Sequence, residues 1–275
     1  MRDARRIRRH RPPSCKDANG KSAKELFAVL CWKFVSALVS GSMSISENIS
    51  VIHERMHSAA RRAGRRTEET ALMAVTKTHP PAIIREAYAA GLRLFGENRV
   101  QEFAGKASSL ADLAAEWHMI GHLQTNKAAK AAELFGAVES LDSVKLAEKL
   151  DSAARKFGKR MAVLIEVNVG GEAAKSGAAP NSRDLEELLL AAPRLEALQF
   201  KGLMTVPPVT DDPEGSRPYF GRLRELRDAI SARKLSAINM DVLSMGMSHD
   251  FEVAIEEGST CIRVGSAIFG ERAKT

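Results

Sequence analysis

The chain has 275 residues, enough for one large core or two smaller domains, and its formal net charge is +7. The first 42 residues account for this excess, because they hold ten Lys/Arg and three Asp/Glu. In the rest of the chain, positively and negatively charged residues are equal in number, so its composition gives no indication of nucleic-acid binding. Three scattered cysteines suit neither a disulfide framework nor a zinc site, and no stretch is long and apolar enough to predict a transmembrane helix. We therefore expect a protein of a reducing, cytoplasmic compartment with no nucleic-acid or membrane partner.

Residues 1–42 combine an arginine-rich start with an apolar run that one lysine interrupts. This order resembles a targeting signal, although the basic part is long and the apolar part contains a charge. The alternative is that translation begins at Met43, where Ser44 and Glu47 form a capping box before an amphipathic helix. We favour this alternative, in which residues 1–42 are a disordered extension or an artefact of start assignment and residues 43–275 form the folded domain.

The folded part is predicted to open with a helix from Ile45 to Arg62, after which strand and helix signals alternate with short turns. The predicted strands are Ala71 to Val75, Arg93 to Phe95, Glu116 to Ile120, Ala137 to Leu141, Met161 to Val169, Phe200 to Met204, Met240 to Leu243 and Cys261 to Val264. The predicted helices between them are Ala82 to Ala90, Val100 to Leu113, Asn126 to Phe135, Ser143 to Phe157, Asn181 to Ala192, Arg217 to Ala232 and Phe251 to Glu256. Strict alternation of eight strands favours an α/β fold, a single closed (β/α)8 TIM-type barrel, with an open doubly wound sheet as the alternative.

The first predicted strand runs directly into Lys77, and Pro80 and Pro81 then end the extended segment. A lysine at the mouth of an apolar core is partly desolvated, which favours the uncharged amine, the nucleophile of Schiff-base chemistry. Most lysines at strand ends only reach into solvent, so Lys77 needs support from elsewhere in the chain.

That support comes from polar and small residues at the ends of other strands, because the site of a (β/α)8 barrel lies at the carboxyl ends of its strands. These residues are Thr76 to His79, Gly96 to Asn98, Gly121 and His122, Asn168, Ser244 to Ser248, and Gly265 and Ser266. A closed barrel would gather all of them at one mouth.

The loops after the seventh and eighth strands have the pattern of phosphate-binding loops. Small residues before a helix leave backbone N–H groups for an anion, and the helix dipole favours negative charge there. Ser244, Ser248 and Ser266 add hydroxyl donors, and Gly265 allows close approach. Each loop alone is more typical of a tight turn with a capping serine. Barrels commonly bind phosphate between these two loops, so both patterns at the two expected positions favour a phosphate site.

Arg263, which precedes Gly265, could face the barrel mouth or pair with a structural carboxylate. A closed barrel would make the first and eighth strands neighbours and bring Lys77 beside the phosphate loops. A lysine imine, a phosphate pocket and an arginine for a ring nitrogen together describe a site for pyridoxal 5'-phosphate.

Long motifs then indicate a family. They are AVTKTHP, FGENRVQE, WHMIGHLQTNK, EVNVGGEAAKSG, KGLMTVPP, LSMGMSHDFEVAIEEGST and IRVGSAIFGER. In this order, from about Met43 to Arg272, the chain resembles the pyridoxal phosphate homeostasis proteins, which are related in fold to the N-terminal barrel of alanine racemase. The resemblance does not cover residues 1–42.

The resemblance implies a role for each candidate residue. Lys77 would form the internal aldimine with pyridoxal 5'-phosphate, Arg263 would meet the pyridine nitrogen, and Asn98 would lie close to the ring. The phosphate would be held by Ser244, Ser248, Gly265 and Ser266. An arginine at the ring nitrogen keeps that nitrogen unprotonated and weakens the ring as an electron sink.

Two functions compete at this point. One is a non-catalytic carrier that buffers pyridoxal 5'-phosphate or delivers it to apoenzymes that it meets transiently; the other is an amino acid racemase. Racemisation needs acid/base groups on both faces of the substrate, and alanine racemases take the second from an additional domain of a partner subunit. The sequence ends at Thr275, soon after the eighth strand, so we expect a monomeric carrier in vitamin B6 homeostasis and no enzyme.

Two further features stay open. His118 and His122 are four residues apart but straddle a strand end, so we expect no metal site. Lys175 follows the fifth strand and is expected to be solvated, although a second lysine could attack the aldehyde during transfer.

Overall fold

The structure, a computed structural model, describes residues 43–172 and 175–270. Its compact unit begins at Ile45 and contains eight parallel strands in a closed barrel, in the order of the sequence. The strands are β1 (Ala71–Val75), β2 (Leu94–Glu97), β3 (Glu116–Met119), β4 (Ala137–Leu141), β5 (Met161–Glu166), β6 (Leu198–Met204), β7 (Ile238–Ser244) and β8 (Cys261–Val264). The predicted (β/α)8 barrel is therefore confirmed, and the open sheet is wrong.

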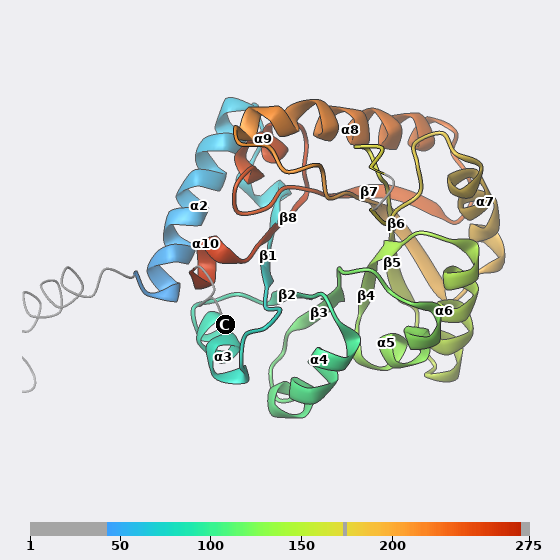
Figure 1. Cartoon of the computed structure of the whole chain (residues 1–275), viewed down its shortest axis with the longest axis horizontal. Helices are drawn as coiled ribbons and strands as arrows, with labels where there is room; N and C mark the ends of the chain where they lie inside the picture. The colour runs from blue at the N-terminus through green and yellow to red at the C-terminus, as the bar shows by residue number, and fades with distance from the viewer. Residues whose placement is uncertain (1–42, 173–174, 271–275) are drawn as a thin grey trace, which may run out of the picture. The chain divides into compact units, whose positions relative to one another are not determined.

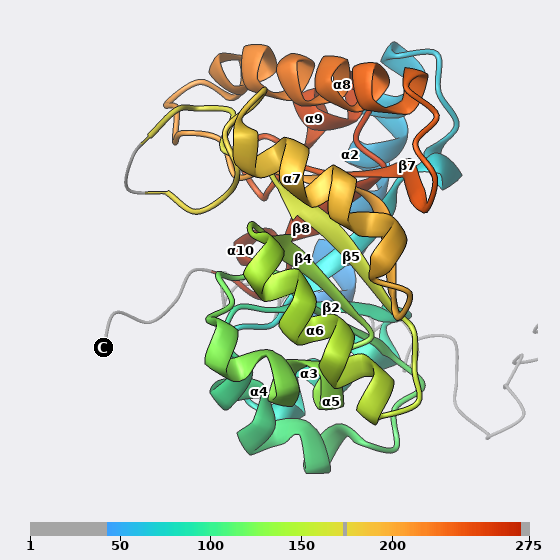
Figure 2. The same cartoon turned by 90° about the vertical axis from the view of Figure 1, so that its right-hand side faces the viewer.

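Helices surround the strands (Figure 1), and α5, α6 and α7 cover the side of β4 and β5 (Figure 2). The α-helices are α2 (Ile45–Arg62), α3 (Pro81–Ala89), α4 (Val100–Lys106), α5 (Ala128–Leu134), α6 (Val144–Lys156), α7 (Arg183–Ala191), α8 (Arg217–Ala232), α9 (Phe251–Glu256) and α10 (Ser266–Phe269). The 3-10 segments are η1 (Thr67–Glu69), η2 (Ala107–Leu110), η3 (Thr125–Lys127), η4 (Ala192–Arg194) and η5 (Pro213–Ser216). None of the described helices combines the length and the apolar character needed to cross a membrane.

The barrel closes where its first strand meets its last. On one side β1 pairs with β2, with Ala74 opposite Phe95, and on the other it pairs with β8, with Met73 opposite Arg263. This pairing places the loop after β1 beside the loop after β8. Lys77 therefore lies next to one of the two loops that are predicted to bind phosphate.

The core lies on both sides of the strands. Four of the five β1 residues are buried, and so is every residue of β4. Five phenylalanines are almost fully enclosed: Phe95, Phe135, Phe200, Phe220 and Phe251. Parallel strands that are covered by helices on one face and packed inside the barrel on the other need this continuous apolar character.

Several predicted boundaries differ from the observed ones. Strand β2 extends to Glu97, so this carboxylate belongs to the strand rather than to the loop after it. Strand β5 ends at Glu166, because Val167 forms only an isolated bridge with Ala178 and the chain then turns. The four-residue helix α10 was not predicted, because so short a segment has no apolar periodicity of its own.

Candidate functional site

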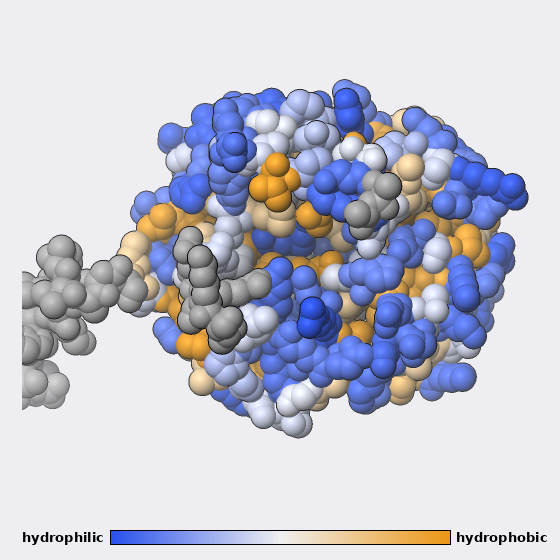
Figure 3. All heavy atoms as spheres, in the orientation of Figure 1, coloured by the Kyte–Doolittle hydropathy of each residue, from blue (hydrophilic) through white to orange (hydrophobic). Residues whose placement is uncertain are grey.

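A cavity of about 400 Å³ lies at the carboxyl ends of the strands, within the size range of small-molecule sites. Figure 3 shows that the face of the molecule turned to the viewer is hollowed near its centre, with both hydrophilic and hydrophobic residues around the hollow. Six of the seven residues predicted for the site line the cavity: Lys77, Asn98, Ser248, Arg263, Gly265 and Ser266. The other lining residues are Val75, His79, Ile120, Val206, Met247, His249 and Gly270. The structure thus brings together residues from the ends of β1, β2, β7 and β8.

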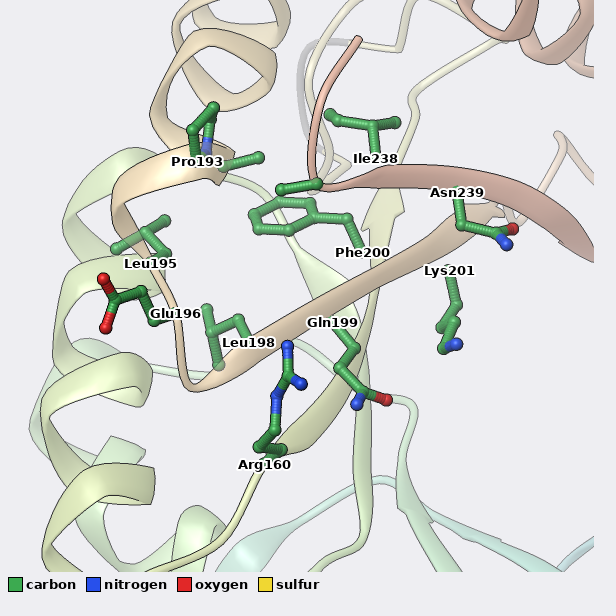
Figure 4. A pocket seen from close by; sticks show the side chains of 12 residues that line it. Arg160, Pro193, Leu195, Glu196, Leu198, Gln199, Phe200, Lys201, Ile238 and Asn239 are labelled. Carbon is green, nitrogen blue, oxygen red and sulfur yellow. The ribbon is translucent and has the colours of Figure 1, made fainter. Parts of the chain in front are cut away.

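A second surface cavity, of about 420 Å³, lies at the opposite end of the strands (Figure 4). Its walls include Gln199 and Lys201 from the start of β6 and Asn239 from the start of β7. Because the sites of (β/α)8 barrels lie at the carboxyl ends of the strands, this cavity is not the candidate site.

The loop that carries Lys77 is held on both sides. The Lys106 ammonium from α4 donates hydrogen bonds to the carbonyl oxygens of Thr76, at 3.0 Å, and His79, at 3.3 Å. Between them, the backbone N–H of Thr78, whose φ is 67°, donates to the Glu102 carboxylate. The loop conformation around Lys77 is therefore fixed by α4 rather than by local turn residues alone.

Lys106 also forms a buried ion pair with Glu97 at the end of β2, with 2.8 Å between Nζ and Oε1. Burial raises the pKa of Glu97, while hydrogen bonds from Lys106 and Thr76 lower it, and the net direction is upward. Glu97 Oε2 is buried and has no hydrogen-bond partner among the described residues. This pair couples β2 and α4 to the Lys77 loop.

The loops after β7 and β8 meet at one hydroxyl group. Ser248 Oγ accepts hydrogen bonds from the backbone N–H groups of Gly265, at 3.2 Å, and Ala267, at 3.3 Å. These converging N–H groups at the edge of the cavity form the kind of donor set that binds a phosphate oxygen. Asn48 Nδ2 of α2 donates to the carbonyl of Ile268, at 2.8 Å, and thereby holds α10 against α2.

Arg263 lies deeper, in the floor of the cavity, and is 4% exposed. Its Nη1 donates to Ser244 Oγ at 2.8 Å, and its Nη2 donates to the carbonyl oxygen of Thr205 at 2.7 Å. Ser244 is fully buried and, unlike the other predicted site residues, does not line the cavity.

A hydrogen-bonded carboxylate lies beneath Ser244 inside the barrel. Glu139 of β4 accepts from Ser244 Oγ at 2.5 Å through Oε2, and its Oε1 is 2.8 Å from His118 Nδ1. Burial alone would raise the pKa of Glu139, but the hydrogen bond and charge of His118 and the charge of Arg263 lower it further than burial raises it. Glu139 is therefore ionised in the barrel interior at neutral pH.

Glu166 ends β5 at the same end of the barrel. Burial, together with the nearby carboxylate of Asp142, raises its pKa to about 7, against the opposing charge of Arg263. Its Oε2 is buried and bonds none of the residues that the structure describes. Glu166 therefore changes charge near neutral pH close to the predicted site.

The two histidines considered for a metal have separate partners. His118 is bonded to Glu139, and His122 Nδ1 is 3.4 Å from Asp142. The described residues contain no group of three potential metal ligands.

Lys175 lies beside the loop that follows β6. Its Nζ donates to the carbonyl oxygen of Pro207 at 3.1 Å and pairs with Glu172. The ammonium is therefore held by two partners rather than solvated alone.

Sequence reasoning missed Glu139 inside the barrel and Lys106 beneath the Lys77 loop, and it placed Glu97 in the loop after β2 rather than in the strand. Glu97 and Glu139 each occupy a position in a buried strand, where an unpaired carboxylate is very costly. That conflict between residue type and position was the available signal, and it predicts a buried partner without saying which one.

Comparison with known proteins agrees with this geometry. The family model for the alanine racemase N-terminal domain matches residues 48–273. A pyridoxal phosphate homeostasis protein of Aquifex aeolicus (strain VF5) is 48% identical over 231 residues, which cover 84% of this chain and 99% of that protein. A second pyridoxal phosphate homeostasis protein, of Pseudomonas aeruginosa, is 44% identical over 229 residues, which cover 83% of this chain and 96% of that protein. A solved structure of PipY from Synechococcus elongatus PCC7942 with PLP bound is 36% identical with a TM-score of 0.71, and the match covers 82% of this chain and 100% of PipY.

The closed barrel and the matched residues define the class of protein as an alanine racemase N-terminal type barrel. Within that class, the identities and coverages show that the chain belongs to the pyridoxal phosphate homeostasis protein family. The family resemblance carried by the sequence motifs is confirmed.

Proposed function

We propose that this protein binds pyridoxal 5'-phosphate in the cavity at the carboxyl ends of the strands and serves in the homeostasis of that cofactor. The observation that carries the proposal is that Lys77, Arg263 and Ser248 all border one cavity, together with Gly265, whose backbone N–H donates to Ser248 Oγ. An amine, a buried cation and an anion cradle match the aldehyde, the ring nitrogen and the phosphate of this one molecule. The names of the relatives and the PLP-bound structure of PipY point to the same ligand.

The residues of the cavity would contact different parts of the cofactor. Lys77 would attach the aldehyde covalently, and Asn98 would lie beside the ring. Ser248, Gly265 and Ser266 would hold the phosphate.

Arg263 would meet the ring nitrogen from the floor of the cavity. Ser244 receives a revised role, because its buried hydroxyl bonds Arg263 and Glu139: it would position Arg263 rather than touch the phosphate.

We further propose a monomeric cytoplasmic carrier without strong catalytic activity, which could meet apoenzymes transiently. A positively charged guanidinium at the ring nitrogen opposes protonation of that nitrogen and so weakens electron withdrawal from a bound amino acid. When bound, the cofactor would supply a reactive aldehyde, while the protein holds and shields it. The relatives are named for homeostasis, not for a reaction, which supports this choice over a racemase.

The experiment that tests the proposal compares the wild type with Lys77→Ala after incubation with pyridoxal 5'-phosphate. We expect an absorbance band of a lysine Schiff base, and a mass increase of one cofactor after borohydride reduction, in the wild type alone. Lys130→Ala, which changes an exposed lysine paired with Glu133, serves as the matched control and should behave as the wild type. A wild type that binds no cofactor would refute the proposal, and rapid racemisation of alanine would refute the carrier role.

A further inference from the structure

Four side chains form a continuous hydrogen-bonded chain through the interior of the barrel. Arg263 of β8 donates to Ser244 of β7 at 2.8 Å, and Ser244 donates to Glu139 of β4 at 2.5 Å. Glu139 in turn bonds His118 of β3 at 2.8 Å. These four hydrogen-bonded side chains therefore cross the barrel and connect the cavity floor with the opposite wall.

The direction of each bond in the centre of the chain follows from the chemistry of the groups. A guanidinium can only donate and an ionised carboxylate can only accept, so the Ser244 hydroxyl must accept from Arg263 and donate to Glu139. Both of the hydroxyl's roles are thus used, and neither charged group can rotate without losing a bond. Charge-assisted hydrogen bonds of this type are short and strong.

Three of these four side chains are also shielded from water. Glu139 is 2% exposed, Ser244 is fully buried and Arg263 is 4% exposed. Removing one member of a buried charged set leaves the other charge unpaired, which costs far more than the loss of a surface pair. Arg263 therefore depends on Glu139 for its position in the cavity floor.

The guanidinium nevertheless has donors left for a ligand. It carries five N–H groups, and among the described residues it bonds Ser244 through Nη1 and Thr205 through Nη2. Since Arg263 also lines the cavity, the remaining donors can meet an acceptor on a bound molecule.

We propose that Glu139 and Ser244 are positioning residues that hold Arg263 against the ring nitrogen of the bound cofactor and make binding depend on that nitrogen. The inference rests on the proposed function, because it takes pyridoxal 5'-phosphate as the ligand. It adds a specificity that neither Lys77 nor the phosphate cradle supplies, since these two recognise only the aldehyde and the phosphate. A ligand with the same aldehyde and phosphate but with a carbon in place of the ring nitrogen would gain no affinity from the hydrogen-bonded side chains that hold Arg263.

The test compares two ligands, pyridoxal 5'-phosphate and its 1-deaza analogue, by titration in the wild type, Glu139→Gln and Ser244→Ala. In both variants we expect the Kd for pyridoxal 5'-phosphate to rise by about tenfold or more, in line with the worth of a charged hydrogen bond. The Kd for the deaza analogue should change by less than about twofold in the same variants, because that ligand makes no use of the ring-nitrogen contact.

Glu116→Gln is the matched control. Glu116 is an exposed carboxylate 3.9 Å from His118 Nε2, so this variant also removes a negative charge facing His118 but leaves the interior chain intact. It should bind both ligands as the wild type does. Ser244→Ala keeps both buried charges, so it preserves the test if Glu139→Gln folds poorly.

Equal losses for the two ligands would show that Glu139 and Ser244 only support the fold, and no loss for either ligand would show that Arg263 holds its position without them. Either result overturns the inference while leaving the proposed function intact. A wild type that binds neither ligand would instead refute the proposed function, and the inference with it.

Discussion

Three buried carboxylates of the barrel differ in the direction of their pKa shifts because their surroundings differ. Glu139 has His118 and Ser244 as hydrogen-bond partners, and its pKa is lowered despite burial. Burial raises the pKa of Glu97 even though Lys106 lies at 2.8 Å. Burial and the Asp142 carboxylate raise the pKa of Glu166 to about 7. Burial raises the pKa of all three, so the balance between burial and the surrounding hydrogen bonds and charges decides the direction of each shift.

Glu166 gives a prediction about pH. Its pKa is raised from 4.5 to about 7 in the folded protein, so between these values the folded state binds more protons than the unfolded state. The contribution of Glu166 to the free energy of unfolding should therefore fall as the pH rises from about 4.5 to about 7. Glu166→Gln stays neutral and should lack this fall, which makes it up to about 3 kcal/mol more stable than the wild type at pH 8, relative to pH 4.5.

Urea unfolding at a series of pH values measures this difference. Glu133→Gln, at an exposed position on α5, is a suitable control and should keep the pH profile of the wild type. Parallel profiles for Glu166→Gln and the wild type would mean that Glu166 ionises normally in the folded protein.

Among single residues, those that line the cavity were easier to predict from the sequence than the buried residues beneath the cavity. Lys77, Asn98 and Gly265 follow strands, and their place at the mouth comes directly from barrel topology. Ser244 looked like a member of the same set, but it is the last residue of β7 and points into the interior. One residue of strand register decides between the mouth and the interior, and sequence patterns do not fix a boundary that closely.

Among the elements, α4 has a larger part in the site than its short length suggests. It supplies Lys106, which bonds the carbonyl oxygens on either side of the Lys77 loop, and Glu102, which accepts from the loop's Thr78 N–H. A seven-residue helix thereby sets the conformation of a loop about thirty residues earlier in the chain.

Lys106→Met should disturb both the fold and the site. The substitution leaves the Glu97 carboxylate buried without its cation, which costs about 3–5 kcal/mol in free energy of unfolding. It also frees the Lys77 loop, so the absorbance band of the lysine Schiff base should be weaker at the same cofactor concentration. Thermal unfolding and cofactor titration measure the two effects.

Two further variants separate the causes. Lys130→Met breaks an exposed pair with Glu133 and should cost less than about 1 kcal/mol. Adding Glu97→Gln to Lys106→Met removes the stranded charge and should restore much of the stability but not the loop contacts. If the double variant recovers the absorbance band as well, the loop contacts of Lys106 have no part in the site.

The elements themselves were predictable to the extent that their patterns were periodic. All eight strands and six of the seven helices between them appear where the sequence pattern placed them, with shifts of a few residues at the ends. The predicted helix from Val100 to Leu113 is instead the short α4 followed by the 3-10 segment η2. Helix ends fray and tighten according to tertiary contacts, which a periodic pattern does not contain.

In the whole molecule, the excess positive charge and the part that matches the family lie in different segments of the chain. All the excess positive charge lies in residues 1–42, whereas the family match begins at residue 48. We therefore expect a chain that starts at Met43 to unfold at the same temperature as the full chain and to bind pyridoxal 5'-phosphate with the same Kd. Differential scanning calorimetry and cofactor titration of the two chains measure this.

The same pair of chains tests where a polyanion would bind. Only the full chain should be retained on heparin at low salt, because the part from Met43 onward is formally neutral. A lower unfolding temperature for the shorter chain would contradict the proposed boundary of the folded domain.

The closure of β1 against β8 has a consequence for the order of events during synthesis. The ribosome releases β1, with Lys77, near the start of the folded part, but β8 and Gly265 emerge almost at its end. Domains form as their segments become available, and contacts between distant segments are made late. On the proposed function, a growing chain would therefore carry Lys77 for nearly the whole of translation without the proposed phosphate-binding loop beside it. We expect capture of the cofactor to begin only when the last strand has joined the first.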